Sequence, residues 1–466
     1  ELPDAALCAT DCFGELLSPQ PGDPQSRVAF ASSAPVPDVN PACNTRIDPT
    51  RSASVAFDGV DLDALAAHFG TPLQVYSAGA IRQRIHALHC ELIGLDAMVC
   101  YAVKANSNHA VLRLMAEAGL GADIVSSGEL RRCLRAGIAA QRIVFSGVGK
   151  SEAEIIEALE AGVCRFNVES FDELCLLRQL ADQRATTTHA AVRINPDVDA
   201  QTHAKISTGK AENKFGVGLD EARRWFAQHP RTSRLRLDGL HVHIGSQILN
   251  LDPFRVALER TAALQRELAG QGHLITSLDV GGGLGVRYRE DEDRAIDIAD
   301  YVDVVRRSLH DFRGRLVFEP GRWLVAEAGL LLTRIIRIKH GQQRRFVVVD
   351  AAMNDLLRPS LYDAWHEIAA VSDTPAQRMI CDVVGPVCET GDTFARAREL
   401  PECAAGDLLM IRTTGAYAAS MASNYNSRPL AAEVMVDDGR YAAIRQRQSF
   451  EQMTAGEVMT PQWQSL

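Results

Sequence analysis

The feature that most limits what this chain can fold into is an alternation of short apolar runs with helical patterns between about residues 96 and 328. The runs recur at intervals of roughly 20 to 45 residues, which is the spacing of repeated βα units. Eight runs have strand character: AMVCYAV at Ala97, ADIVS at Ala122, RIVFSG at Arg142, RFNVE at Arg165, AAVRIN at Ala190, LDGLHVHIG at Leu237, SLDVGG at Ser277 and RLVFEPG at Arg315. Eight such units predict an α/β fold of the closed (β/α)8 TIM type.

The segments between the runs have helix signals of their own. SEAEIIEALEAG, which starts at Ser151, has a serine at the cap, a glutamate at the capping-box position and a glycine at its end. It predicts an amphipathic helix between two strands.

Beyond residue 329 the pattern changes to short β-rich runs. They start at Thr333, Arg345, Asp382, Asp407 and Glu433, and they predict a second, mostly antiparallel domain of the β-sandwich or β-barrel type. VAFDGVDL, at Val55, is a candidate for a further strand of that domain. We therefore expect a tail or linker over 1–54, a segment belonging to the β-domain over 55–75, the barrel over 76–328 and the β-domain over 329–466.

The expected tail is rich in proline and has no sustained apolar period, so we assign it no chemistry. The chain starts at Glu1 rather than Met. We expect it to be cut from a longer product or to follow another domain.

Charge and cysteine content exclude several classes of protein. The formal net charge is -10 and the chain has no basic run, so nucleic acid is not an expected partner. Apolar stretches are interrupted by charge, as by Glu327 in the run from Trp323 to Leu332, so no membrane span is expected. Eleven cysteines without a CxxC pair argue against a disulfide framework or a metal site and favour a reducing cytoplasm.

Polar residues stand at or near the ends of the predicted barrel strands. The active site of such a barrel lies at the carboxyl ends of its strands, so these positions are informative. They are Lys104, Asp123, Arg193, His243, Ser246, Gly281–Gly283 and Glu319. Each taken alone fits a solvated charge, a satisfied polar residue or a flexible loop.

The combination indicates a specific cofactor. A glycine loop after the seventh strand is positioned to bind phosphate, because backbone N–H groups without side chains can approach an anion closely. A phosphate site together with a strand-end lysine, Lys104, indicates pyridoxal phosphate held as a Schiff base.

Nine segments, in order, resemble the diaminopimelate decarboxylase family of alanine racemase-like, fold type III enzymes, a group that includes ornithine and arginine decarboxylases. They are YAVKAN at Tyr101, ADIVSSGEL at Ala122, STGKAENKFG at Ser207, HVHIGSQI at His241, LDVGGGLGV at Leu278, FEPGR at Phe318, LLRPSLYDAWHEI at Leu356, GPVCETGD at Gly385 and GAYAASMASNYNSRPLAAEV at Gly415. The resemblance covers about residues 55 to 450. It implies decarboxylation of meso-2,6-diaminopimelate to L-lysine and CO2, the last step of lysine biosynthesis. Some relatives are fused to an upstream aspartate kinase.

The resemblance also implies how the cofactor is held. Lys104 would form the Schiff base, Glu319 would stand beside the ring nitrogen and raise its pKa, and His243 would stack on the ring. The other expected cofactor-binding residues are Asp123, Arg193, Ser246, Gly282, Gly283, Gly321, Arg322 and Tyr417.

The substrate's far end carries an ammonium and a carboxylate, and the resemblance assigns residues to both. Arg322 and Arg358, helped by Tyr362, would bind the carboxylate, because guanidinium pairs bidentately with it. Glu389 would accept the ammonium, and Tyr417 would touch both cofactor and substrate.

Protonation of the α-carbon after CO2 leaves needs a general acid, and Cys388 resembles that donor. In relatives the barrel of one subunit is completed by the β-domain of another. We therefore expect a homodimer in which Cys388, Glu389 and Tyr417 act across the interface.

Departures from the family pattern are small: Thr390 stands where serine is more common, and the residues after Tyr417 vary among members. One alternative is a decarboxylase acting on ornithine, arginine or a carboxylated polyamine, although ornithine-type enzymes would carry aspartate at Glu389. A non-catalytic regulatory homologue would lose Lys104 or Cys388. A racemase would place a cation where Glu319 stands.

Overall fold

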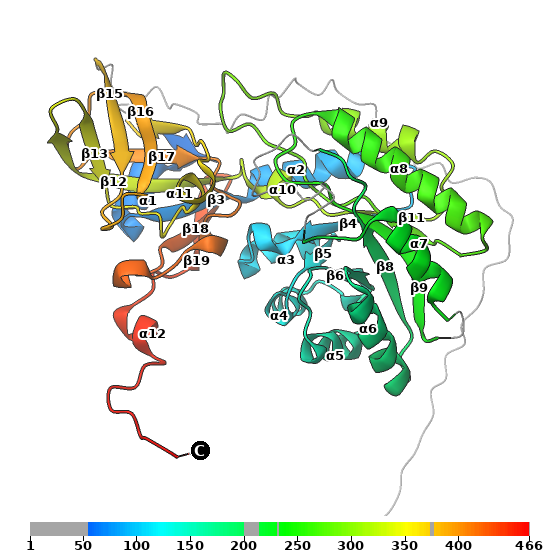
Figure 1. Cartoon of the computed structure of the whole chain (residues 1–466). Helices are drawn as coiled ribbons and strands as arrows, with labels where there is room; N and C mark the ends of the chain where they lie inside the picture. Colours follow the sequence, from blue (N-terminus) through cyan, green and yellow to red (C-terminus); the bar gives the residue numbers. More distant parts are fainter. Residues whose placement is uncertain (1–54, 200–213, 231–232, 373–376, 466) are drawn as a thin grey trace, which may run out of the picture. The chain divides into compact units, whose positions relative to one another are not determined.

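The computed structural model describes residues 55–199, 214–230, 233–372 and 377–465 (Figure 1). The predicted tail over 1–54 and residues 207–213 of the STGKAENKFG segment lie outside the described residues. All other segments singled out above are described.

Eight parallel strands close into a barrel in the order β10-β11-β4-β5-β6-β7-β8-β9. They are β4 (Ala97–Ala102), β5 (Gly121–Ile124), β6 (Ile143–Phe145), β7 (Arg165–Val168), β8 (Thr188–Ile194), β9 (Leu235–Val242), β10 (Ser277–Asp279) and β11 (Arg315–Phe318). Each strand overlaps one of the eight apolar runs, so the predicted (β/α)8 barrel is confirmed. The runs are continuous because both faces of a parallel barrel are buried.

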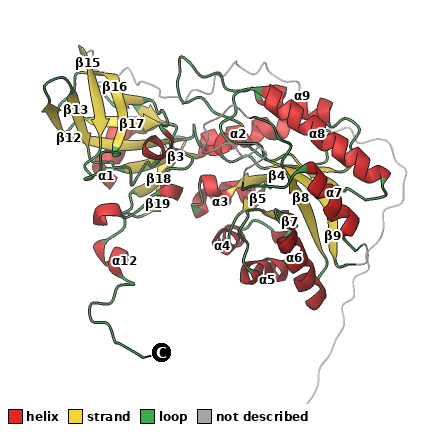
Figure 2. Ribbon diagram, viewed as in Figure 1, coloured by secondary structure: helices red, strands yellow, loops and turns green. Residues whose placement is uncertain are grey.

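Helices alternate with the strands and surround them (Figure 2). They are α3 (His109–Glu117), α4 (Ser127–Ala136), α5 (Glu152–Ala161), α6 (Phe171–Gln183), α7 (Leu219–Gln228), α8 (Leu251–Gly270) and α9 (Ile298–Ser308). The chain enters the barrel through α2 (Ala78–Glu91), which packs against α9 and against α10 (Arg322–Val325). A helix that precedes the first barrel strand thus occupies the eighth helical position.

The helix predicted after Ser151 is present as α5. The Ser151 hydroxyl accepts from the Glu154 N–H, the Glu154 side chain accepts from the Ser151 N–H, and Gly162 ends the helix in the left-handed conformation. The capping signals read from the sequence therefore set both ends of this helix.

The remaining chain forms a nine-stranded, mostly antiparallel sheet with the main path β16-β15-β13-β12-β3-β18-β19 and with β14 and β17 beside it. The strands are β3 (Leu73–Ser77), β12 (Gly329–His340), β13 (Arg345–Val349), β14 (Ile368–Ala370), β15 (Arg378–Val384), β16 (Thr393–Pro401), β17 (Leu408–Arg412), β18 (Ala432–Asp437) and β19 (Arg440–Arg445). Only the β13–β15 and β18–β3 pairs are parallel. The fold class of the second domain is confirmed.

The N-terminal strand of this sheet is β3, not the segment at Val55. That segment forms β1 (Ala56–Phe57) and β2 (Val60–Asp61), which pair with each other in a separate two-stranded sheet. Helix α1 (Leu62–Phe69) follows, and its apolar side chains pack with those of β1 and β2 on the large sheet. The segment thus joins the core of the domain by packing rather than by strand pairing.

Glycines bring the loop after β17 to the mouth of the barrel. A Cβ atom at Gly415 would overlap the carbonyl oxygen of Val325 in α10. The Gly415 N–H donates to Ala326 O at 3.0 Å, and Asn106 Nδ2 donates to Gly415 O at 3.2 Å. This close approach places Tyr417, whose N–H donates to Ala105 O at 2.8 Å, beside the end of β4.

None of the helices in the described part of the chain is long and apolar enough to span a bilayer.

Replacing Gly415 by Ala should destabilise the protein, because the added methyl group has no room beside Val325. We expect a loss of about 1–3 kcal/mol, the usual cost of overpacking, seen as a lower midpoint of thermal unfolding. Gly149→Ala is the matched control, because no atom lies within 4 Å of its added Cβ. Equal midpoints for the two variants would contradict the close approach.

Candidate active site

Lys104 lies at the carboxyl end of the first barrel strand, in the short 3-10 turn Val103–Ala105 that follows β4. Its Nζ atom is 3.2 Å from Oδ2 of the buried Asp123 on the neighbouring strand β5, and its side chain is 44 % exposed. Burial favours the neutral amine, but Asp123, Tyr417 and Glu319 together outweigh it, so the pKa of Lys104 lies above its ordinary value. The amine is anchored yet reachable from the barrel mouth.

A buried polar network lies at the carboxyl ends of β7, β9, β10 and β11. Glu319 Oε2 is 3.2 Å from His241 Nε2. Asn167 Nδ2 lies 3.3 Å from both Glu319 Oε1 and Asp279 Oδ2, and the Gly281 N–H donates to Asp279 Oδ1 at 2.9 Å. All four side chains are buried.

The two carboxyl groups of this network differ in their ionisation. Burial and repulsion by Glu319 raise the pKa of Asp279 well above its ordinary value. Burial acts in the same direction on Glu319, but His241 and Lys104 outweigh it and hold the pKa of Glu319 well below its usual range. Glu319 therefore carries the charge at neutral pH, and Asp279 holds the proton.

His241, Asp279 and Glu319 each offer one ligand atom, and these atoms lie within 4.8 Å of one another. A metal ion could be held by such a group. The sequence predicted no metal site, and this stays a prediction; the three side chains also take part in hydrogen bonds within the network.

The glycine loop after β10 packs against two neighbouring strand ends. A Cβ atom at Gly282 would overlap Glu319 O, and one at Gly283 would overlap Gly245 O. The Gly282 N–H donates to Nδ1 of His243 at 3.2 Å. Burial, with repulsion by Arg193 and Lys104, lowers the pKa of His243 well below its ordinary value. The loop thus lies beside a neutral imidazole, a suitable face for an aromatic ring.

Arg322 extends from the start of α10 toward the same loops. Its Nη2 donates to Ser246 Oγ at 3.0 Å, and its Nη1 donates to the Tyr288 hydroxyl at 2.6 Å. Its Nε has no partner among the described residues. Ser246 and Arg322 are thus together beside the glycine loop, as predicted for a phosphate site, while Gly321 ends the turn after β11.

Arg358 comes from the sheet domain, where it begins α11 (Arg358–Tyr362). Its guanidinium lies 4.3 Å from the centre of the Tyr288 ring, and its Nη1 is 2.7 Å from His366 Nε2. His366 Nδ1 is 2.9 Å from Arg412 O, and burial with the nearby Arg358 charge lowers the pKa of His366 well below its ordinary value. A neutral His366 can therefore accept a hydrogen bond from Arg358.

Neither guanidinium has a carboxylate partner among the described residues. Arg322 is 7 % exposed and Arg358 is 5 % exposed. Burial and repulsion by Arg322 lower the pKa of Arg358. An unpaired buried cation is costly, so two of them at one barrel mouth form a strong site for anionic groups.

Tyr417 and Tyr362 complete this part of the site. The Arg322 guanidinium lies 4.8 Å from the centre of the Tyr417 ring, and Tyr362 acts electrostatically on both arginines. The expectation that Tyr417 reaches across a subunit interface is wrong, because its backbone and ring contact Ala105 and Arg322 of its own chain.

Cys388 and Glu389 are exposed, and among the described residues no hydrogen bond or ion pair joins either of them to the other predicted site residues. They lie in the turn between β15 and β16, which the Ser360 hydroxyl joins to α11 by donating to Gly391 O at 2.6 Å. In the described chain, neither side chain is joined to Lys104 by a hydrogen bond or an ion pair.

Arg193 is buried on β8, and its Nη1 donates to Glu169 Oε1 at 2.9 Å. Its guanidinium lies 4.7 Å from the centre of the Phe215 ring. Unlike Arg322 and Arg358 it has a carboxylate partner, and its positive charge helps to lower the pKa of His243.

Five residues of the site were not predicted: Asn167, His241, Asp279, Tyr288 and His366. His241 and Asp279 lie inside the recognised HVHIGSQI and LDVGGGLGV segments, at strand positions that face the barrel interior. Their apolar neighbours gave a signal for a buried polar pair. No sequence signal pointed to Tyr288, because its partners Arg322 and Arg358 are distant from it in the sequence.

These residues fit the chemistry of pyridoxal phosphate. Lys104 supplies an amine, Glu319 a buried carboxylate and His243 a neutral ring. Ser246, Arg322 and the glycine loop supply hydroxyl, guanidinium and backbone donors, and the buried Arg322 Nε is without a partner in the described part of the chain. Together these groups suit a ligand that is a phosphorylated aromatic aldehyde with a protonated ring nitrogen.

Comparison with known proteins agrees with this arrangement. Residues 78–326 match the family model of the pyridoxal-dependent decarboxylase, pyridoxal binding domain. The diaminopimelate decarboxylase of Zymomonas mobilis is 47 % identical over 410 residues, which are 87 % of this chain and 97 % of that protein. That of Pseudomonas aeruginosa is 48 % identical over 412 residues, 88 % of this chain and 99 % of that protein.

Solved structures give the same result. Diaminopimelate decarboxylase from Helicobacter pylori, complexed with L-lysine, has a TM-score of 0.82 and 42 % identity, covering 85 % of this chain and 98 % of that chain. The enzyme from M. jannaschii, in co-complex with L-lysine, has a TM-score of 0.85 and 34 % identity, covering 90 % and 99 %. The resemblance in the sequence motifs is confirmed, and this chain belongs to the diaminopimelate decarboxylase family of pyridoxal-dependent decarboxylases.

Proposed function

We propose that this chain removes one carboxylate from meso-2,6-diaminopimelate and releases L-lysine and CO2, with pyridoxal phosphate as its cofactor. The observation that carries the proposal is the pair of buried guanidiniums, Arg322 and Arg358, which have no carboxylate partner among the described residues. A substrate with a second carboxylate at its far end neutralises this charge.

Pyridoxal phosphate, when bound, supplies the electron sink that a carbanion at the α-carbon requires. Lys104 would hold the cofactor through its amine. Glu319 keeps its negative charge in the interior and so favours a proton on the ring nitrogen. Asp279 holds its own proton and leaves that charge on Glu319.

His243 presents a neutral ring face to the cofactor. Ser246, Gly282, Gly283 and Gly321 bind the phosphate with one hydroxyl and backbone N–H groups. Asp123 and Arg193 line the site around Lys104 and His243.

Arg322, Arg358 and Tyr362 bind the distal carboxylate of the substrate. Tyr288 and His366 keep the two guanidiniums in place, because each of them contacts at least one guanidinium directly. Ornithine, arginine and similar amines have no second amino-acid carboxylate, so they would leave these cations unpaired.

Cys388 donates the proton to the α-carbon, and Glu389 accepts the distal ammonium. Both side chains are exposed in the single chain, and we assign them to the site of a second copy in a homodimer. Tyr417 acts in its own subunit. In this arrangement each barrel provides Lys104, and the partner provides the acid.

We place the protein in the cytoplasm. All eight cysteines of the described residues are free thiols, as expected in a reducing compartment.

The first test is product formation by the protein reconstituted with pyridoxal phosphate. Meso-diaminopimelate should give lysine, and ornithine, arginine and carboxynorspermidine should give no product. Turnover of one of these amines would overturn the substrate assignment, and the visible absorption of bound cofactor without any turnover would favour a regulatory role.

Replacing Arg358 by Gln should lower kcat/KM for diaminopimelate by roughly 10²-fold, because a charge-assisted hydrogen bond to the distal carboxylate is lost. The visible absorption of the bound cofactor should not change. Arg337→Gln, at an exposed position on β12, is the matched control. Unaltered kinetics in Arg358→Gln would remove this residue from the substrate pocket.

Replacing Glu319 by Gln should lower kcat by roughly 10²-fold, because an electrostatic contact to the ring nitrogen is lost. Since the pKa of Glu319 is held low, the charge that it contributes is present throughout the neutral pH range. The variant should therefore move the pH titration of the cofactor's visible absorption to lower pH. Glu152→Gln, an exposed change in α5, should leave both unchanged, and an unshifted titration in Glu319→Gln would count against the contact.

Mixing Lys104→Ala with Cys388→Ala subunits should restore activity. Each heterodimer would hold one intact site, so a random mixture should recover about a quarter of the wild-type rate. Mixing Lys104→Ala with Glu319→Ala is the control, because both changes fall in the barrel half of the site and no intact site can form. Heterodimers of the first pair that stay inactive would rule out shared sites.

A further inference from the structure

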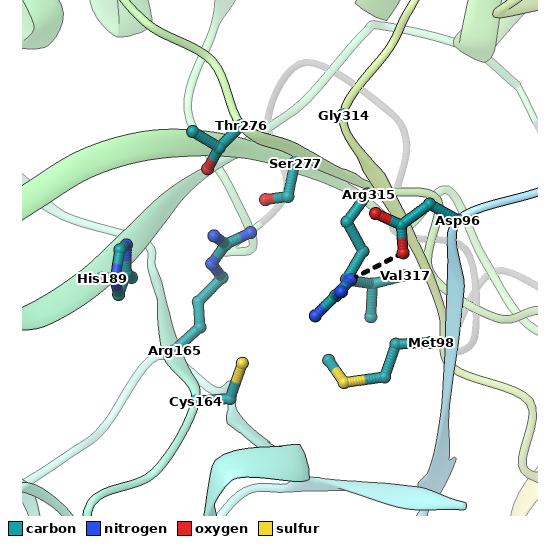
Figure 3. A pocket seen from close by; sticks show the side chains of 10 residues that line it. All are labelled: Asp96, Met98, Cys164, Arg165, His189, Thr276, Ser277, Gly314, Arg315 and Val317. Atoms are coloured by element: carbon teal, nitrogen blue, oxygen red, sulfur yellow. Dashed lines mark hydrogen bonds and ion pairs between the residues drawn. The ribbon is translucent and has the colours of Figure 1, made fainter. Parts of the chain in front are cut away.

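A cavity opens at the end of the barrel opposite to Lys104, and Figure 3 shows its lining. Its lining residues stand at or just before the amino ends of strands, among them Met98 in β4, Arg165 in β7, Ser277 in β10 and Arg315 in β11. Its volume is about 330 Å³. At roughly 30 Å³ for each water molecule of liquid, the cavity has room for a small organic molecule.

The charged groups of this cavity are partly paired. Arg165 Nη2 donates to Asp238 Oδ1 at 3.3 Å, and the other oxygen of Asp238 is 2.7 Å from His189 Nδ1. Arg315 Nε donates to Asp96 Oδ1 at 3.0 Å. Both carboxylate oxygens of Asp238 therefore have hydrogen-bond partners, whereas only one nitrogen atom of each arginine donates a hydrogen bond.

The unused hydrogen-bonding groups are mostly donors. Within the described part of the chain, Arg165 Nη1 and both terminal nitrogens of Arg315 have no partner, and the buried Ser277 hydroxyl and Arg165 Nε have none either. Figure 3 shows the two guanidiniums and the Ser277 hydroxyl turned toward the same space. Each guanidinium is ion-paired with an aspartate, and its remaining free N–H groups can still donate to an anion.

Glycine keeps this space open. A Cβ atom at Gly239 in β9 would lie 2.9 Å from both Arg165 Nη1 and Ser277 Oγ. The lining also has apolar side chains, Met98, Cys164 and Val317, and Met98 and Cys164 lie across the cavity from the Ser277 hydroxyl. A ligand with a charged head and a short apolar body would match both parts.

We propose that this cavity is a binding site for a small organic carboxylate. The carboxylate lies between Arg165 and Arg315 and accepts a hydrogen bond from Ser277, and the hydrocarbon part lies on Met98, Cys164 and Val317. The site is separate from the active site, because Lys104 stands at the other end of β4. The proposal does not depend on the reaction that the active site performs.

Cys164 permits a test that reports on this location alone. The protein, loaded with pyridoxal phosphate, is treated with a small thiol-methylating reagent, and the modification of each cysteine is followed by peptide mass spectrometry. Saturating hexanoate should slow the modification of Cys164 about tenfold and leave the exposed Cys90 unaffected. Hexylammonium, with the same body and the opposite charge, should give no protection.

Variants separate this site from other anion sites. Arg315→Gln should weaken the protection by hexanoate about tenfold in apparent Kd, because a charge-assisted hydrogen bond is lost. Arg315 is half-exposed, so the change leaves the barrel core intact. Arg313→Gln, at an exposed position two residues away, and Arg358→Gln, in the active site, should both keep full protection.

Three results would overturn the proposal. The first is an unchanged rate at Cys164 with hexanoate, and the second is protection that Arg358→Gln abolishes. The third is equal protection by inorganic phosphate at the same concentration, which would mean that the cavity selects charge without the hydrocarbon part.

Discussion

The contact of two guanidiniums with one tyrosine ring holds the catalytic end of this molecule together. Arg322 and Tyr288 come from the barrel half of the chain, and Arg358 and His366 come from the sheet domain. Like charges repel, so the pair is held by the aromatic ring, the Tyr288 hydroxyl and a neutral imidazole. The two domains therefore meet around a positive charge that their own described side chains do not neutralise, and an anionic ligand stabilises this junction as well as occupying it.

The cofactor end of the site uses the opposite sign of charge. Glu319 stays ionised in the interior because His241 and Lys104 lower its pKa, and Asp279 beside it keeps a proton. The two adjacent carboxyl groups thus share a single negative charge, because ionising both of them in the buried interior would be costly. The site is therefore electrostatically polar, with positive charge where the substrate binds and one negative charge beside the cofactor ring. This polarity fits a ligand whose two ends differ in charge.

The sequence predicted the barrel well because parallel strands with two buried faces appear as uninterrupted apolar runs, and because capping residues such as Ser151 act locally. It missed β3, β14, β16 and β19. The strand β16 carries Arg396, Arg398 and Glu399 on the edge of the sheet, so its composition resembles that of a loop. Lys104, Glu319 and Arg358 were found through motifs, whereas Tyr288 was missed because its role depends on contacts between distant segments. The placement of Tyr417 in its own subunit was likewise visible only from the backbone contact with Ala105.

The position of β3 has a consequence for how the chain reaches this structure during synthesis. β3 leaves the ribosome before any barrel strand, yet its partners β12 and β18 follow the whole barrel. Contacts between segments so far apart in sequence are slow to form, because a long loop must close first. The barrel can therefore assemble while β3 still has two unpaired edges, and those edges are the part of the nascent chain most open to wrong strand pairing and to chaperones.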